Sequence, residues 1–130
     1  MVHYELLNGV TLAYAGDSYY ELYIRKYLID RRLTKVNDLH KLAIKYVSAF
    51  AQAKVIQELS NMKFLTEEEE DIVRRGRNGK INHKRSNVDI ITYKNSTSFE
   101  ALIGYLFLMG KTERLEEVIL QAIKIIENGD

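Results

Sequence analysis

The sequence predicts an all-α fold, and three observations support that prediction. Proline is absent from the 130 residues. Apolar residues recur at helical spacing over long segments, whereas residues that favour strands, such as Thr11 and Thr92, are scattered. The chain is 46% apolar and 28% charged, which is typical of globular proteins and excludes a disordered or collagen-like chain. We therefore expect one helical domain over residues 1–130.

Three helices are expected in the first part of the chain. The first, over 10–29, carries apolar residues around most of its circumference, which predicts a central position in the fold. The second covers about 38–59. The third begins at Thr66, whose spacing from Glu69 predicts a capping box, and it ends near Gly76.

A basic loop and two further helices are expected in the remainder. Residues 76–94 combine glycine, asparagine and basic residues with little apolar periodicity, so we expect a loop there, with or without a short helix. A fourth helix is expected over 98–109, because Thr97 and Glu100 have capping-box spacing at its start. The fifth helix begins at Thr112.

Several classes of protein are excluded by composition. Cysteine is absent, so disulfide scaffolds, thiolate nucleophiles and cysteine-based metal sites are ruled out. The three histidines are too widely separated to indicate a zinc site. The longest apolar run, over 101–110, is about half of the ~20 residues that a membrane-spanning helix needs, and the start of the chain lacks a secretory signal. We expect a cytoplasmic protein with no membrane partner.

Basic residues are concentrated in one segment although the formal net charge is only +1. Residues 72–94 contain seven basic side chains and a single acidic one. A solvated loop would explain this excess, but arginine also offers forked donors for phosphate, and we expect nucleic-acid contact here. The predicted RNA-binding residues are Arg74, Arg75, Arg77, Lys80, Lys84 and Arg85.

Aromatic residues do not accompany this basic segment. The five tyrosines of the first helix, at positions 14, 19, 20, 23 and 27, are expected to lie in the core rather than to stack on bases. Without an aromatic platform, the basic segment suits the backbone of a duplex better than splayed single-stranded bases.

The first helix also carries a polar stripe. Asp17, Glu21 and Arg25 lie on one face at i, i+4 and i+8. A Glu21–Arg25 ion pair facing water explains two of them but leaves Asp17 without an intrahelical partner. Gly16 costs about 1 kcal/mol relative to alanine inside a helix, and Asp17 is also unfavourable there. Two such residues side by side favour a functional reason, although a structural one stays open.

Glu100 is a second carboxylate of interest. Its capping-box spacing with Thr97 gives it a structural explanation. Carboxylates on two core helices could nevertheless meet at one edge, where hard oxygen ligands suit Mg²⁺. An acidic edge beside a basic loop would then indicate metal-dependent phosphodiester chemistry, although the residues alone do not establish that the two carboxylates meet.

Two segments resemble a known family. They are LAYAGDSYYEL at 12–22 and STSFEALIGYL at 96–106. Together they resemble the catalytic domain of the ribonuclease III family, specifically its Mini-ribonuclease III branch. The resemblance covers nearly the whole chain, including RRGRN at 74–78.

This resemblance implies an all-helical endonuclease domain that acts as a homodimer on double-stranded RNA. It implies Mg²⁺ as cofactor, with Mn²⁺ as a substitute, and products with 5′-phosphate and 3′-hydroxyl ends. The implied substrate is precursor ribosomal RNA of the large subunit. Asp17 matches the Gly-Asp aspartate of the family and Glu100 its Phe-Glu-Ala glutamate, so both are expected to be catalytic metal ligands, with Glu21 assisting through water. The carboxy-terminal double-stranded RNA-binding domain of the family is not expected here.

The chain departs from full-length members of the family at three acidic positions. It has Val10 and Ala13 where they carry glutamates, and Thr97 where they carry an aspartate. The mini branch resembles the chain in these losses. The thinner acidic cluster keeps an alternative open, a non-catalytic RNA-binding module with the same fold. A purely structural helical protein would explain neither the Gly16–Asp17 pair nor the basic segment.

Overall fold

The computed structural model describes residues 2–31, 35–79 and 88–129, and within these ranges it contains helices and no strand. The prediction of an all-α fold is therefore confirmed. The elements, in chain order, are η1 (Tyr4–Leu6), α1 (Gly9–Asp30), α2 (Val36–Val47), α3 (Ala49–Asn61), α4 (Glu67–Arg77), α5 (Ile90–Leu108) and α6 (Thr112–Asn128).

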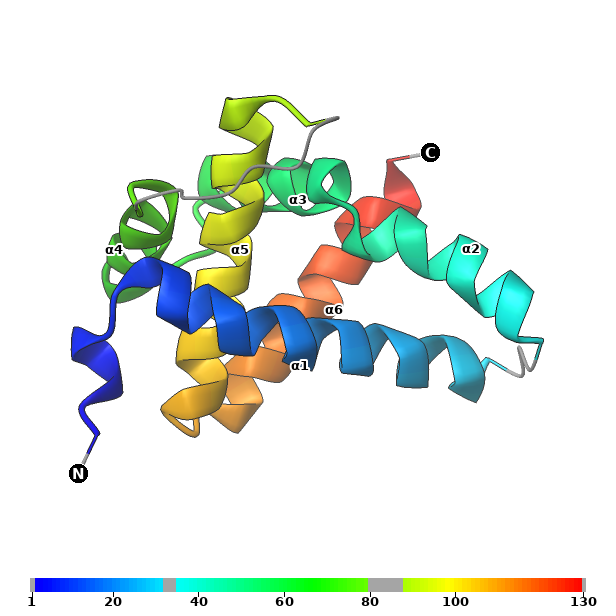
Figure 1. Ribbon diagram of the computed structural model, residues 1–130, viewed down its shortest axis with the longest axis horizontal. Helices are drawn as coiled ribbons and strands as arrows, with labels where there is room; N and C mark the ends of the chain where they lie inside the picture. Colours follow the sequence, from blue (N-terminus) through cyan, green and yellow to red (C-terminus); the bar gives the residue numbers. More distant parts are fainter. Residues whose placement is uncertain (1, 32–34, 80–87, 130) are drawn as a thin grey trace.

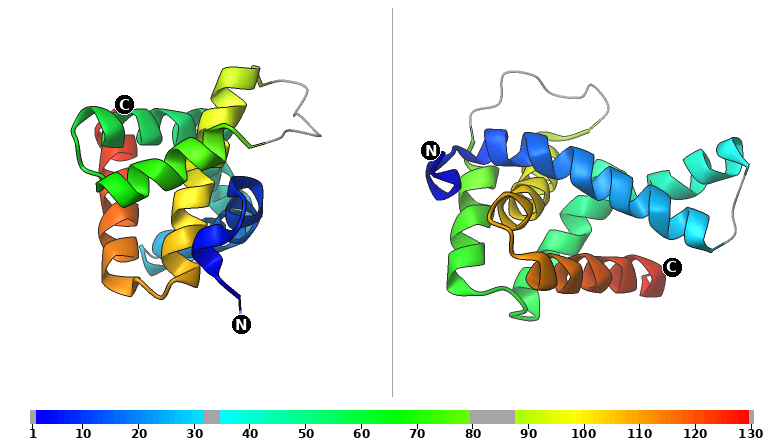
Figure 2. Two further views of the ribbon diagram at one scale, coloured as in Figure 1. Left: turned by 90° about the vertical axis from the view of Figure 1, so that its left-hand side faces the viewer. Right: turned by 90° about the horizontal axis from the view of Figure 1, so that it is seen from below.

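Helix α5 is the centre of the fold. Helices α1, α3, α4 and α6 pack around it (Figure 1, Figure 2). Its residues 101–106 are all buried, and Phe99 has no exposed surface. The prediction of a central first helix is therefore wrong, because α1 keeps one face in solvent, where Tyr14 is 83% and Leu22 is 67% exposed.

The predicted helix over 38–59 is divided in two. Ser48 has an extended backbone, with φ −63° and ψ 156°, and it accepts a hydrogen bond at its Oγ from the Ala51 N–H at 3.2 Å. A serine side chain that caps a new helix competes with continuation of the old one. The Gln52 side chain donates to the Val47 carbonyl at 3.2 Å, which satisfies an acceptor at the end of α2. The break is therefore caused by the Ser48 cap, and apolar periodicity does not reveal such a cap.

Helix α5 begins eight residues earlier than the predicted start at 98. Asp89 is its N-cap and accepts a hydrogen bond from the Thr92 N–H at 2.9 Å. The predicted capping box of Thr97 and Glu100 is wrong, since both residues lie inside the helix and Thr97 Oγ1 donates to the Tyr93 carbonyl at 3.0 Å. Within the predicted basic region 72–94, residues 72–77 belong to α4 and 90–94 to α5.

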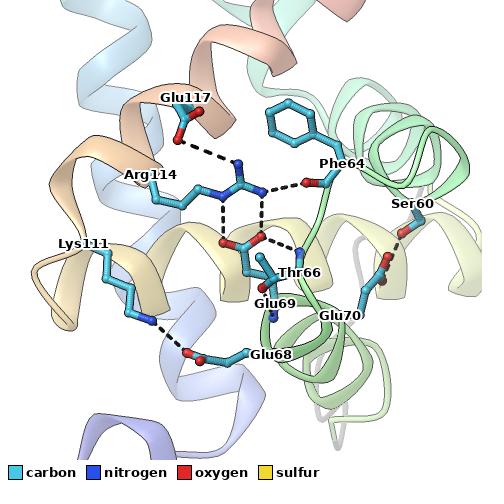
Figure 3. Close-up of polar contacts among 9 residues, drawn as sticks. All are labelled: Ser60, Phe64, Thr66, Glu68, Glu69, Glu70, Lys111, Arg114 and Glu117. Atoms are coloured by element: carbon cyan, nitrogen blue, oxygen red, sulfur yellow. Dashed lines mark hydrogen bonds and ion pairs between the residues drawn. The ribbon is translucent and has the colours of Figure 1, made fainter.

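The start of α4 is held by a polar network that reaches α6 (Figure 3). Thr66 and Glu69 form the predicted capping box. Arg114 donates from Nε and Nη2 to the two carboxylate oxygens of Glu69, both at 2.8 Å, and from Nη2 to the Phe64 carbonyl at 2.7 Å. Because the Glu69 side chain is buried, this bidentate pair fixes α4 against α6.

Candidate active site

The two predicted carboxylates lie where α1 crosses α5. A Cβ atom built on Gly16 would lie 1.8 Å from the backbone carbonyl oxygen of Glu100, so the two main chains are in direct contact. Asp17 follows Gly16 and is exposed, and Glu100 is partly exposed on α5. Asp17 and Glu100 thus both belong to the helix segments that meet at this crossing, and both have accessible surface.

Glu21 lies one turn beyond Asp17 on the same face of α1. Its Oε1 accepts a hydrogen bond from Arg25 Nη2 at 3.0 Å, and both side chains are exposed to solvent. The ion pair expected from the sequence is therefore present. It occupies one carboxylate oxygen of Glu21, and among the residues that the structure describes the other oxygen accepts no hydrogen bond.

The donor set at the crossing fits a magnesium ion. Mg²⁺ is bound in many enzymes by one or two carboxylates together with water and substrate phosphates. Asp17 and Glu100 supply hard oxygen donors from two helices held in contact. No group of three or more histidine, cysteine, aspartate or glutamate side chains suited to a metal ion occurs in the described ranges. The metal shell would thus depend on water and substrate oxygen.

Two of the three non-acidic residues at the family positions, Ala13 and Thr97, are buried, whereas Val10 is exposed and has no such explanation. Ala13 is buried as part of the hydrophobic core, where an unpaired carboxylate would be unfavourable. Thr97 is also buried, and its hydroxyl is satisfied by the backbone of its own helix. Neither residue contributes a donor to the site.

The basic segment begins next to α1. A Cβ atom on Gly79 would lie 2.7 Å from Val10 Cγ2, so the segment that follows α4 contacts the first turn of α1. Val10 precedes Asp17 by about two helical turns. Arg74 and Arg77 are exposed in the last turns of α4, and Arg74 Nη1 pairs with Asp71 Oδ1 at 2.9 Å. Three other predicted RNA-binding residues lie outside the described ranges; these are Lys80, Lys84 and Arg85.

Arg75 differs from its basic neighbours. Its guanidinium donates to the Glu5 carbonyl at 2.8 Å and also to the Leu7 carbonyl. Its side chain is partly buried beneath the segment that precedes α1. Arg75 thus holds the amino-terminal segment against α4.

The tyrosines of α1 follow the prediction with one exception. Tyr20 is buried, and Tyr19, Tyr23 and Tyr27 pack partly buried against the core. Tyr14 does not belong to the core, because it lies on the solvent face of α1. The aromatic residues of α1 are thus divided between two faces that the sequence pattern alone does not separate.

Gly104 was not among the predicted site residues. A Cβ atom on Gly104 would lie 1.9 Å from the Leu12 carbonyl oxygen and 2.9 Å from the Gly16 nitrogen. Gly16 and Gly104 therefore face each other across the crossing. A glycine inside a helix costs about 1 kcal/mol relative to alanine. That unfavourable choice is the sequence feature that could have indicated a special role for Gly104.

Comparison with known proteins identifies the family. The Ribonuclease III domain family matches residues 10–111. The chain belongs to the ribonuclease III family. It is 46% identical over 127 residues to Mini-ribonuclease 3 of Streptococcus pneumoniae, covering 98% of this chain and 99% of the relative. It is 50% identical over 124 residues to Mini-ribonuclease 3 of Enterococcus faecalis, covering 95% of this chain and 94% of the relative.

The fold is also found in a crystal structure. A protein from Fusobacterium nucleatum is 32% identical, superposes with a TM-score of 0.80, and the match covers 90% of this chain and 93% of that one. The resemblance to the Mini-ribonuclease III branch is thus confirmed, and family membership indicates an endoribonuclease. No helix in the described ranges combines the length and apolar character needed to span a membrane.

Proposed function

We propose that this ribonuclease III family member is a Mg²⁺-dependent endoribonuclease that cleaves double-stranded RNA, with Asp17 and Glu100 as its catalytic metal ligands. The supporting observation is the contact between Gly16 and the Glu100 backbone, because Asp17 directly follows Gly16 and both carboxylate residues have accessible surface. Mn²⁺, which also accepts carboxylate oxygen, is the expected substitute. The proposed products carry 5′-phosphate and 3′-hydroxyl ends.

Each residue of the site has a role in this proposal. Asp17 and Glu100 hold the metal ion at the exposed edge of the crossing, where a phosphodiester can reach it. When bound, Mg²⁺ lowers the pKa of water and neutralises charge that develops on the phosphate. Glu21 orients a water molecule with the carboxylate oxygen that Arg25 does not engage.

The RNA duplex is proposed to lie along the end of α4. Arg74 and Arg77 are exposed there, and Lys80, Lys84 and Arg85 follow in sequence. Guanidinium and ammonium groups at these positions would contact successive phosphates without reading the bases. Arg75 is assigned instead to the amino-terminal segment that it binds.

A homodimer is proposed to complete the enzyme. The solvent face of α1 exposes apolar side chains, and these are Val10, Tyr14, Leu22 and Ile29. Large exposed apolar groups that share one helix face mark an interaction surface. A second copy on this face would place two pairs of carboxylates beside one duplex, one pair for each strand. The proposed substrate is a precursor of large-subunit ribosomal RNA in the cytoplasm.

A cleavage assay on a long RNA duplex tests the enzyme. With Mg²⁺, the wild type should cut, whereas Asp17→Asn and Glu100→Gln should lose at least about 100-fold in rate, since each removes a metal ligand. Asp38→Asn, which alters an exposed carboxylate on α2, is the matched control and should cut normally. Addition of EDTA should stop all cleavage.

One alternative is favoured by a specific observation, the small donor set at the crossing. In that alternative the chain is a non-catalytic RNA-binding module with the same fold. Duplex binding by the wild type without cleavage, in both Mg²⁺ and Mn²⁺, would establish the module and refute the enzyme.

A further inference from the structure

We propose that Gly16 and Gly104 are positioning residues of the active site, because they set the separation of α1 and α5 at the point where Asp17 and Glu100 emerge. The inference rests on the proposed function, in which these carboxylates hold the metal. Figure 1 shows α1 crossing α5, and the two glycines lie opposite each other at that crossing.

The contact is reciprocal and involves the main chain on both sides. A Cβ atom on Gly16 would lie 1.8 Å from the Glu100 carbonyl oxygen and 2.7 Å from the Gly104 nitrogen. A Cβ atom on Gly104 would lie 1.9 Å from the Leu12 carbonyl oxygen. Backbone atoms within a helix cannot move singly, so a methyl group at either glycine must displace a whole helix segment.

Neighbouring side chains leave no other way to relieve the contact. Leu12, Phe99 and Ile103 have no exposed surface and pack in the same core. Close-packed interiors transmit strain rather than absorb it. A carbon atom needs roughly 3.5 Å from its neighbours, so the crossing must open by about 1.5 Å.

Such an opening matters more for metal binding than for duplex binding. Mg²⁺ requires ligand distances of about 2.0–2.1 Å in near-ideal octahedral geometry. A misplacement of about 1 Å can cost about 100-fold in rate. Phosphate contacts by long basic side chains at the end of α4 tolerate far larger shifts. A wider crossing should therefore weaken the metal site selectively.

Gly9 provides a matched control, because it makes an equally close contact at a different crossing. A Cβ atom there would lie 2.4 Å from the Arg75 carbonyl oxygen, between α1 and α4, away from Glu100. If the glycines serve packing alone, Gly9→Ala and Gly104→Ala should have the same consequences. If Gly104 positions the carboxylates, Gly104→Ala should raise the metal concentration needed for half-maximal cleavage, and Gly9→Ala should not.

The experiment compares the wild type, Gly16→Ala, Gly104→Ala and Gly9→Ala in three measurements. These are the Mg²⁺ concentration for half-maximal cleavage, Mn²⁺ binding without RNA by electron paramagnetic resonance, and duplex binding in EDTA. For Gly16→Ala and Gly104→Ala we expect both metal midpoints to rise about tenfold or more, with duplex binding within about twofold of wild type. For Gly9→Ala we expect a lower Tm and unchanged metal midpoints. Trimethylamine N-oxide is included throughout to support folding.

A second variant separates position from packing. Asp17→Glu extends the carboxylate by one methylene group. It should weaken Mn²⁺ binding in the wild type but restore part of it in Gly104→Ala, because the longer side chain spans the wider crossing.

Each remaining outcome overturns the proposal. A folded Gly104→Ala with wild-type metal midpoints would show that the crossing does not control the site. If neither glycine variant folds in trimethylamine N-oxide, the crossing serves the fold alone. Failure of the proposed function looks different, since the wild type itself would then neither cleave RNA nor lose Mn²⁺ binding on Asp17→Asn.

Discussion

Glu69 is a buried carboxylate that stays ionised through its partners. Burial alone would raise its pKa, but hydrogen bonds from Arg114 and from the Thr66 backbone outweigh burial and lower it. Its ionised form therefore contributes stability that is complete above the ordinary glutamate pKa of about 4.3. That contribution is lost as the pH falls through the lower pKa of the folded state.

Removing the arginine tests this pair. Arg114→Met should lower the free energy of unfolding by about 3 kcal/mol at pH 7, because Glu69 then stays buried without a counter-charge. Urea unfolding measures the change, and the difference from wild type should narrow as the pH falls through the lowered pKa of Glu69 in the folded wild type. Arg74→Met removes an exposed pair with Asp71 and should cost less than about 1 kcal/mol. Equal losses in the two variants would contradict the role of burial.

Single residues also show what sequence reasoning reached. Asp17 stands out within a helix because it lacks an intrahelical partner, and its position at the crossing agrees with that signal. The sequence allows two interpretations of Glu100, and the start of α5 at Ile90 removes the one in which it caps the helix. Gly104 went unnoticed because the sequence does not show which backbone faces it.

At the scale of elements, α5 shows why helix boundaries were misplaced. Its first half contains a run of buried polar residues, Asn95, Ser96, Thr97 and Ser98. The hydroxyl groups of Ser96, Thr97 and Ser98 donate to carbonyls of the same helix, so burial leaves them satisfied. Apolar periodicity cannot detect a helix face that is small and polar, whereas the capping box located the start of α4, and the predicted start at Thr112 located α6.

The end of α4 carries a prediction about RNA binding. Arg74→Gln combined with Arg77→Gln should weaken duplex binding and reduce the slope of log K against log salt by about 0.9 for each lost phosphate contact. Fluorescence anisotropy at several salt concentrations measures the slope. Lys124→Gln, which removes an exposed charge from α6, is the control and should leave the slope unchanged. An unchanged slope in the α4 variant would remove this helix end from the RNA surface.

At the scale of the whole molecule, one face of α1 exposes large apolar side chains among the described residues. The opposite face packs against α6, where the Tyr23 hydroxyl donates to Glu116 and the Tyr27 hydroxyl to Glu127, both at 2.7 Å. Helix α1 is thus anchored along one side and open along the other. The exposed apolar face is the surface on which we expect the proposed homodimer to form.

Sedimentation equilibrium tests the proposed association. The wild type should be dimeric at assay concentrations, and Leu22→Asp should shift it toward monomer, because it places a charge at the centre of the apolar face. Leu120→Asp changes an exposed leucine on α6 and should leave the assembly unchanged. A fully active monomer would contradict the dimer.

The glycine crossing of α1 and α5 also has an evolutionary consequence. In the proposed site the separation of the helices that carry the two carboxylates is set by main-chain atoms in contact, and every sequence has the same main chain. Side chains elsewhere in the core can be exchanged without altering that distance, provided that the two glycines are kept. We therefore expect the site to tolerate neutral substitutions elsewhere in the core, and to be sensitive to any substitution at Gly16 or Gly104.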